Sequence, residues 1–139
     1  MPFVRTIGVR FRDCDQFGHV NNAVYLTYCE EARVGYTRLF WGDDAVSAAR
    51  YVVGRATVDY RSPAHCGETL RVTATITAMR RTSFVMAYEI MAADGRLVAT
   101  AETVQVMIDQ ARQVPRPLPP EFRARVGAFE GRAYPEAAA

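Results

Sequence analysis

The densest group of chemically useful side chains lies within ten residues near the N-terminus. It comprises two carboxylates, one imidazole and two amides, from Asp13, Asp15, His19, Asn21 and Asn22. Helical spacing of apolar residues begins directly after this group, so we predict a loop that leads into a helix. The first turn of a helix presents unpaired N–H groups and a partial positive charge, which can hold a carbonyl oxygen that becomes negative during acyl transfer. A carboxylate beside it can attack the carbonyl carbon or activate a water molecule.

A structural interpretation accounts for the same residues. Asp and Asn side chains often cap turns and helix starts, and a histidine can pack or hydrogen-bond locally. Composition alone favours this structural interpretation for most loops of this kind.

Apolar periodicity predicts the elements that position the loop. A spacing of three or four residues indicates one long helix over residues 22–40, and a period of two indicates strands. The last strand is apolar on both faces over part of its length, which favours an interior place in the sheet. A strand, a helix and four further strands are typical of an α+β fold with an antiparallel five-stranded sheet wrapped around one long helix. The expected strands cover residues 3–12, 52–61, 69–78, 83–90 and 97–108.

Length and composition predict a single domain. The chain has 139 residues, half of them apolar, so a core can form. We expect one domain over residues 1–139, with a core of about 3–109. The Pro-rich segment 110–139 is expected to leave the sheet as a C-terminal extension, with a short helix over 121–126.

Composition also argues against several classes of function. The 17 basic residues, all arginine, exceed the 15 acidic residues by too little for a nucleic-acid binder. No uncharged apolar run approaches the roughly 18 residues that span a bilayer, and the N-terminus lacks a signal-peptide core, so we expect a cytoplasmic protein without membrane partners. Three cysteines without C-x-x-C spacing argue against a disulfide framework and a metal site, and no cofactor is expected.

A resemblance to a known family supports the chemical interpretation of the loop. The family is the 4-hydroxybenzoyl-CoA thioesterase family of hotdog-fold acyl-CoA thioesterases. Its opening signature resembles Arg12-Asp13-x-Asp15-x-x-Gly18-His19-Val20-Asn21-Asn22-x-x-Tyr25, followed by Glu30-x-Ala32-Arg33. The later segments Tyr60-Arg-Ser-Pro-Ala64 and Gly67-Glu-Thr-Leu also resemble it, so the likeness runs from about Val4 to Ile108.

The resemblance implies a function for each part of the loop. Asp15 matches the family's catalytic carboxylate, and the backbone N–H that polarises the thioester carbonyl corresponds to the Asn22 region. We therefore take Asp15, Asn22 and His19 as candidate catalytic residues, with Gly18 and Tyr25 as candidate substrate contacts. The expected reaction is hydrolysis of an acyl-CoA to a free acid and coenzyme A. A thiolate leaves readily, so one carboxylate and an oxyanion site suffice.

A basic pair marks a second candidate site. Arg80 and Arg81 precede Ser83 at the expected turn between the third and fourth strands. Such a pair can be a solvated hairpin end, because arginine usually lies outside. It can also clamp the phosphates of coenzyme A, which guanidinium groups bind with paired hydrogen bonds. The resemblance supports the clamp, because relatives hold the nucleotide with basic side chains.

Alternative functions remain open at this point. Glu30 or Glu31 can supply the carboxylate from the helix, as in another hotdog lineage, but the hydroxyl residue that lineage needs one turn later is replaced by Val34 and Gly35. A non-catalytic module that binds acyl-CoA or an acyl carrier would use the same groove. A dehydratase would need a histidine on the helix. The sequence lacks a G-x-S-x-G motif, which argues against an α/β-hydrolase.

The open sheet predicts self-association. An edge strand leaves N–H and C=O groups unpaired, and two identical edges can satisfy each other with closed symmetry. We expect a homodimer or homotetramer, and the resemblance implies active sites at the subunit boundary.

Overall fold

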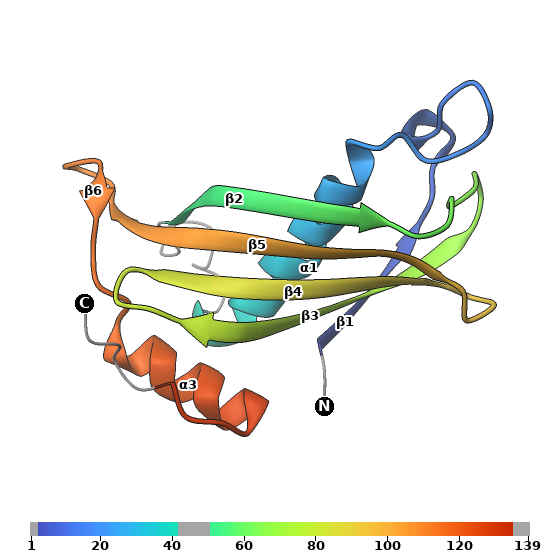
Figure 1. Ribbon diagram of the computed structural model, residues 1–139. Coiled ribbons are helices and arrows are strands. Elements are labelled where there is room, and N and C mark those ends of the chain that lie inside the picture. The colour runs from blue at the N-terminus through green and yellow to red at the C-terminus, as the bar shows by residue number, and fades with distance from the viewer. Residues whose placement is uncertain (1–2, 42–50, 135–139) are drawn as a thin grey trace.

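The computed structural model describes residues 3–41 and 51–134, which form one antiparallel sheet curved around a helix (Figure 1). The strands lie in the order β1-β3-β4-β5-β2, and a short sixth strand pairs with β5. This arrangement confirms the predicted hotdog architecture. The elements are β1 (Phe3–Gly8), a 3₁₀ helix (Phe11–Asp13), α1 (Val24–Trp41), β2 (Tyr51–Tyr60), β3 (Thr69–Met79), β4 (Ser83–Ala92), β5 (Leu97–Asp109), β6 (Val114–Pro115) and α3 (Pro120–Glu130).

The core lies between α1 and the inner face of the sheet. The alternation of β3 turns its apolar residues inward and its threonines outward, as the period of two predicts. β5 lies between β4 and β2, which confirms its predicted interior place. The α1 residues buried in this core are Tyr25, Tyr28, Cys29, Ala32, Tyr36 and Phe40.

The start of α1 differs by two residues from the prediction. Asn21 closes the first turn, because its carbonyl accepts the Val24 N–H at 2.9 Å and its side-chain oxygen accepts the Ala23 N–H at 3.0 Å. Regular helix therefore begins at Val24. This leaves Asn22 in the turn before α1.

The prediction that the first strand runs to Arg12 is wrong. β1 ends at Gly8, and the chain then turns through the 3₁₀ helix, which leaves Phe11 87% exposed. The Asp13 carboxylate accepts hydrogen bonds from the Arg10 backbone N–H at 3.0 Å and from its guanidinium at 2.9 Å. These local bonds between residues three apart override the alternating pattern.

The C-terminal helix is longer than predicted. α3 runs from Pro120 to Glu130 and ends at Gly131, whose φ of 71° is the left-handed conformation that glycine favours. Its buried Phe122 packs edge-on against Phe84, with ring centroids 5.3 Å apart. Gly127 does not stop the helix, because an isolated glycine in a packed helix is tolerated.

The two edges of the sheet differ in how they are covered. β1 pairs with β3 only as far as Ala74, and the segment after α3 binds the β3 edge beyond that point. There the Tyr134 hydroxyl donates to the Ile76 carbonyl. β2 pairs with β5 on one side, and most of its residues are exposed. No helix within the described residues is long and apolar enough to span a membrane.

Candidate active site

A tight turn fixes one oxygen of Asp15 and leaves the other available. Asp15 Oδ1 accepts the backbone N–H of Phe17 at 2.9 Å and that of His19 at 3.1 Å. The turn closes because Gly18 adopts φ 79° and donates its N–H to the Asp15 carbonyl at 3.1 Å. Across residues 3–41 and 51–134, no group donates to Asp15 Oδ2. The free oxygen can therefore act on a substrate or on a water molecule.

Asp13, two residues earlier, anchors the loop instead. Its side chain is buried, and it accepts hydrogen bonds from Arg10 at 2.9 Å and from the Tyr28 hydroxyl at 2.9 Å. Burial favours the neutral acid, but the hydrogen bonds from Arg10 and Tyr28 outweigh it and lower the pKa of Asp13 below its ordinary value. Its carbonyl accepts the Asn21 N–H at 2.9 Å, which ties the turn to the start of α1.

Among the described residues, the carbonyl of Asn22 is hydrogen-bonded and its N–H is not. The Tyr60 hydroxyl donates to the Asn22 carbonyl at 2.9 Å and so ties the peptide that joins Asn22 to Ala23 to the end of β2. Within the described part of the chain, the Asn22 N–H has no acceptor. An unpaired N–H just before a helix is a suitable donor to a developing oxyanion.

The structure brings four of the sequence-predicted residues into one pocket. Its volume is about 260 Å³. The predicted residues are Asp15, His19, Asn22 and Tyr25, whereas Gly18 shapes the turn without lining the pocket. The remaining lining residues are Val20, Tyr60, Arg61, Ser62 and Pro63.

Tyr25 forms a wall of this pocket. It is buried, its hydroxyl accepts the Ala64 N–H at 3.2 Å, and its ring contacts that of Tyr60 edge-on at 5.2 Å. Burial raises the pKa of the Tyr25 hydroxyl above its ordinary value, so it stays protonated at neutral pH. Tyr25 therefore supports the pocket as a packing residue and not as an acid or base.

Two histidines meet beside the Asp15 turn. The rings of His19 and His65 lie 5.1 Å apart in an edge-on contact, and the two residues form an isolated antiparallel bridge. Cys66 lies in the turn that follows His65. Among the described residues, no three His, Cys, Asp or Glu side chains are placed to hold a metal ion.

Five residues that line the pocket were not predicted as site residues from the sequence, and three of them lie at the end of β2 and just after it. Tyr60 is the last residue of β2, and Arg61 and Ser62 follow it and line the pocket before Pro63. The available signal was the Tyr-Arg-Ser-Pro segment at a strand end, a position where functional side chains commonly lie. We used this segment only for the family resemblance.

The basic pair lies at the opposite end of the sheet. Arg80 and Arg81 are exposed at the turn between β3 and β4, and Ser83 begins β4. The eleven residues of β3 span about 35 Å, so a single chain does not bring this turn to Asp15 (Figure 1). The turn is held by the C-terminal extension, since the Leu118 N–H donates to the Arg81 carbonyl at 2.9 Å.

The helix carboxylates also lie apart from the Asp15 pocket. Glu30 and Glu31 are exposed on α1 and line a separate hollow of about 180 Å³ with Arg5 and Arg38. Neither residue lines the pocket that contains Asp15. The geometry therefore favours Asp15 over the helix carboxylates.

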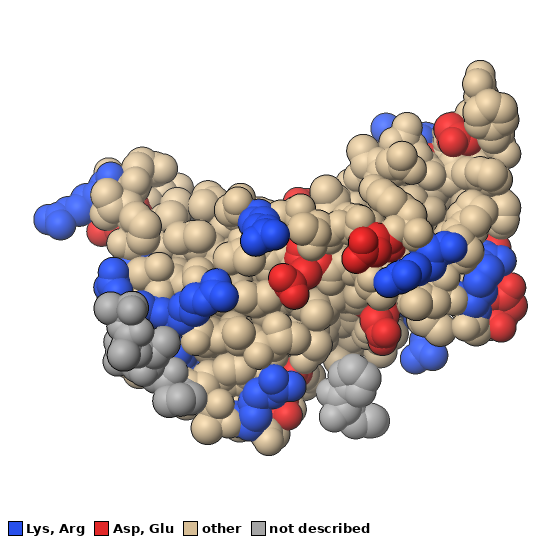
Figure 2. Space-filling model, in the orientation of Figure 1, with Lys and Arg blue, Asp and Glu red and all other residues tan. Residues whose placement is uncertain are grey.

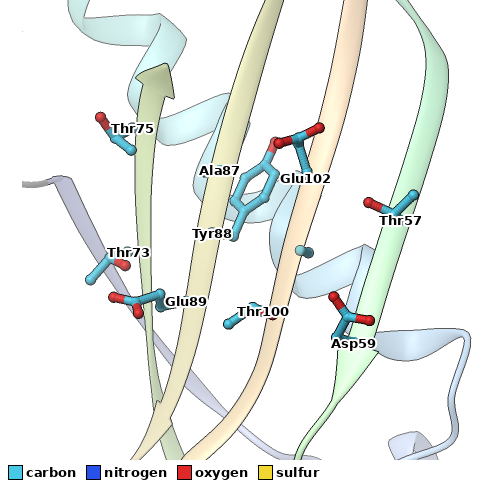
Figure 3. A pocket seen from close by; sticks show the side chains of 10 residues that line it. Thr57, Asp59, Thr73, Thr75, Ala87, Tyr88, Glu89, Thr100 and Glu102 are labelled. Atoms are coloured by element: carbon cyan, nitrogen blue, oxygen red, sulfur yellow. The ribbon is translucent and has the colours of Figure 1, made fainter.

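A further hollow of about 470 Å³ lies on the outer face of the sheet, away from α1 (Figure 3). Threonines and three carboxylates, Asp59, Glu89 and Glu102, point into it from neighbouring strands. All its lining residues lie on strands, whereas the pocket that contains Asp15 includes Asn22 just before α1. Figure 2 shows acidic and basic side chains interspersed over this side of the molecule.

Comparisons with known proteins find relatives over most of the chain. The family model of the thioesterase-like superfamily matches residues 9–126. The chain is 34% identical to the acyl-CoA thioester hydrolase YbgC of Escherichia coli O6:H1 over 116 residues, or 81% of this chain and 87% of that one. It is 30% identical to the 1,4-dihydroxy-2-naphthoyl-CoA hydrolase of Synechococcus elongatus over 117 residues, which cover 80% of this chain and 85% of that hydrolase.

A solved structure shows the same fold. The thioesterase of Thermus thermophilus, crystallised with coenzyme A and zinc, superposes with a TM-score of 0.86 at 36% identity and covers 93% of this chain and 94% of its own. The fold is that of a hotdog thioester hydrolase. The chain belongs to the thioesterase-like superfamily.

Proposed function

We propose that this protein hydrolyses an acyl-CoA thioester to a free acid and coenzyme A. One observation carries this proposal: the same pocket contains the free carboxylate oxygen of Asp15 and, just before α1, the unpaired backbone N–H of Asn22. YbgC and the Synechococcus hydrolase are both named as hydrolases of CoA thioesters, which supports the choice of coenzyme A as the carrier.

The proposed reaction uses these two groups together. The thioester carbonyl oxygen accepts the Asn22 N–H, which stabilises the negative charge that develops there. In one route, Asp15 Oδ2 removes a proton from a water molecule while the water oxygen bonds to the acyl carbon. In the other route, Asp15 Oδ2 itself bonds to the acyl carbon, and water then hydrolyses this intermediate to release the acid. The carbon–sulfur bond breaks, and the coenzyme A thiolate leaves and takes up a proton. The backbone N–H of His19 holds the other Asp15 oxygen in place.

Release of free thiol from a panel of acyl-CoA substrates tests the proposal. Asp15→Asn keeps the side-chain shape but removes the base or nucleophile, and a lost catalytic carboxylate commonly costs about two to four orders of magnitude in rate. Glu102→Gln, on the outer sheet face, is the matched control and should keep full activity. Activity that survives in Asp15→Asn but not in Glu30→Gln would assign the reaction to the helix carboxylate.

The same assay separates hydrolysis from mere binding. If the wild-type protein binds acyl-CoA but releases no thiol, the protein is a non-catalytic acyl-CoA or acyl-carrier module. Binding of a non-hydrolysable thioether analogue, measured by calorimetry, provides that comparison.

We further propose that the active unit is at least a homodimer joined through β2. Pairing two β2 strands about a twofold axis places the start of one beside the end of the other. The β3–β4 turn lies at the same end of the sheet as the start of β2, because Tyr51 pairs with Met107 while Ser83 pairs with Val106. The dimer thus turns Arg80 and Arg81 of one chain toward the Asp15 pocket of the other.

A further inference from the structure

The Asp15 pocket contains one guanidinium group, that of Arg61. This residue directly follows β2, and its backbone is held rigidly, since the N–H groups of Arg61 and Ser62 both donate to the Val98 carbonyl, at 2.9 and 3.1 Å. The Ser62 hydroxyl donates to the Leu97 carbonyl at 2.9 Å. A cation on such a fixed support is suited to recognising a charged group.

Among the described residues, the Arg61 guanidinium forms no ion pair with a carboxylate. Throughout the described residues, no hydrogen bond or ion pair involves its side chain, which is exposed toward the pocket. By contrast, two nearby arginines are neutralised: Arg10 contacts Asp13 at 2.9 Å, and Arg96 contacts Glu68 at 2.8 Å. The Arg61 guanidinium is therefore available for an anion of the substrate.

The size of the pocket indicates which part of the substrate this anion belongs to. A sphere of 260 Å³ is about 8 Å across, small for a ligand pocket. The pantetheine arm between the thioester sulfur and the first phosphate is as long as four to five peptide residues, or roughly 16 Å when extended. When the thioester lies against Asp15 and the pantetheine arm extends away from it, the coenzyme A phosphates therefore lie outside the pocket. An anion that Arg61 binds there must lie on the acyl side.

We propose that Arg61 binds a carboxylate or similarly acidic oxygen on the acyl group, so that the enzyme prefers acyl chains that carry a negative charge a few bonds from the thioester. Guanidinium and carboxylate groups form paired, charge-assisted hydrogen bonds, which give both affinity and orientation. This inference rests on the proposed function and specifies the substrate class for the same site.

Two acyl chains of equal length test the inference. Glutaryl-CoA ends in a carboxylate and pentanoyl-CoA ends in a methyl group, and thiol release is measured with both. Arg61→Gln is expected to lower kcat/KM for glutaryl-CoA about tenfold to hundredfold, as expected for a lost hydrogen bond between charged groups, and to leave pentanoyl-CoA nearly unchanged. Arg71→Gln, an exposed arginine on β3 outside the pocket, is the control and should change neither value.

Other outcomes overturn the assignment. An equal loss with both acyl chains would mean that Arg61 acts on the thioester itself. A loss that disappears when N-acetylcysteamine replaces coenzyme A would mean that Arg61 contacts the phosphates. Unchanged kinetics would remove Arg61 from recognition altogether. If the wild-type protein hydrolyses neither substrate nor any other acyl-CoA, the proposed function itself has failed, which is a result distinct from each of these.

Discussion

At the scale of single residues, two carboxylates only two positions apart have different roles because their surroundings differ. Asp13 is buried and satisfied by Arg10 and Tyr28, whereas Asp15 is exposed and has one oxygen without a donor among the described residues. The first holds the shape of the loop, and the second is available for chemistry. The sequence places both in one polar segment, and only the family resemblance separated them.

Asp13→Asn is expected to lower the free energy of unfolding by roughly 1–3 kcal/mol, because a buried charge-assisted hydrogen-bond set is lost. The pKa of Asp13 is lower in the folded state than in the unfolded chain, where it is near 3.9. The ionised Asp13 therefore stabilises the fold fully above about pH 3.9, and this stabilisation is lost as the pH falls through the lower pKa of the folded state. Urea unfolding at pH 7 and at pH 3 measures this effect. The difference in free energy of unfolding between the wild-type protein and Asp13→Asn should be smaller at pH 3 than at pH 7.

Asp94→Asn is the control for this measurement, because Asp94 lies in an exposed turn and its contact with Arg96 is largely solvated. A loss of stability as large in Asp94→Asn as in Asp13→Asn would contradict the assigned role of Asp13.

At the scale of elements, the end of β2 and the start of α1 form the site together. The Tyr60 hydroxyl connects the last residue of β2 to the Asn22 peptide, and Arg61 follows at once. The turn between β3 and β4 lies far away in the same chain, although its residue types match a phosphate clamp. Its contribution therefore depends on how two sheets join.

Replacing Arg80 and Arg81 together by alanine is expected to raise KM for acyl-CoA several-fold and to leave kcat nearly unchanged, because phosphate contacts supply mostly uniform binding. The effect should weaken at high salt, where exposed charges are screened. Steady-state kinetics with acyl-CoA and with the matching N-acetylcysteamine thioester measure it. An equal rise in KM with the truncated thioester, which lacks the phosphates, would remove this pair from the coenzyme A site.

Element types were predictable from the sequence where one residue pattern dominates. The helical stripe of α1 and the alternation of β3 each place apolar groups on one face, and tertiary packing reinforces both. The turn at 10–13 was missed because its cause is a pairing of Arg10 with Asp13, which no periodicity reveals. The sequence did not predict Arg61 as a site residue, because it continues the series of polar residues at every second position of β2, which indicates a solvent-facing side chain.

At the scale of the whole molecule, the exposed β2 edge is the feature that calls for a partner. Within the described chain, the ten residues of β2 have no neighbouring strand on one side. Two of them, Val52 and Val53, are 49% and 44% exposed. A long exposed edge with apolar side chains is normally paired or covered in native proteins. The proposed phosphate clamp and the proposed shared site both depend on pairing at this edge.

Analytical ultracentrifugation at assay concentration is expected to show a species of at least twice the 15.5 kDa mass of one chain. Val52→Glu combined with Val53→Glu places like charges along the paired edges and should shift the protein toward monomer, with activity falling in parallel. Thr57→Ser, a mild change further along β2, is the control. A fully active monomer would contradict both the dimer and the shared-site geometry.

The contact of Tyr134 with the β3 edge has a consequence for how far assembly proceeds. A sheet with two open edges can add copies at both ends and grow without limit, as fibrils do. Here the residues after α3 occupy the part of the β3 edge that β1 does not reach. In the proposed dimer, the edge left for a further copy is therefore short: it comprises the six residues of β1, because the C-terminal extension contacts the β3 edge beyond them.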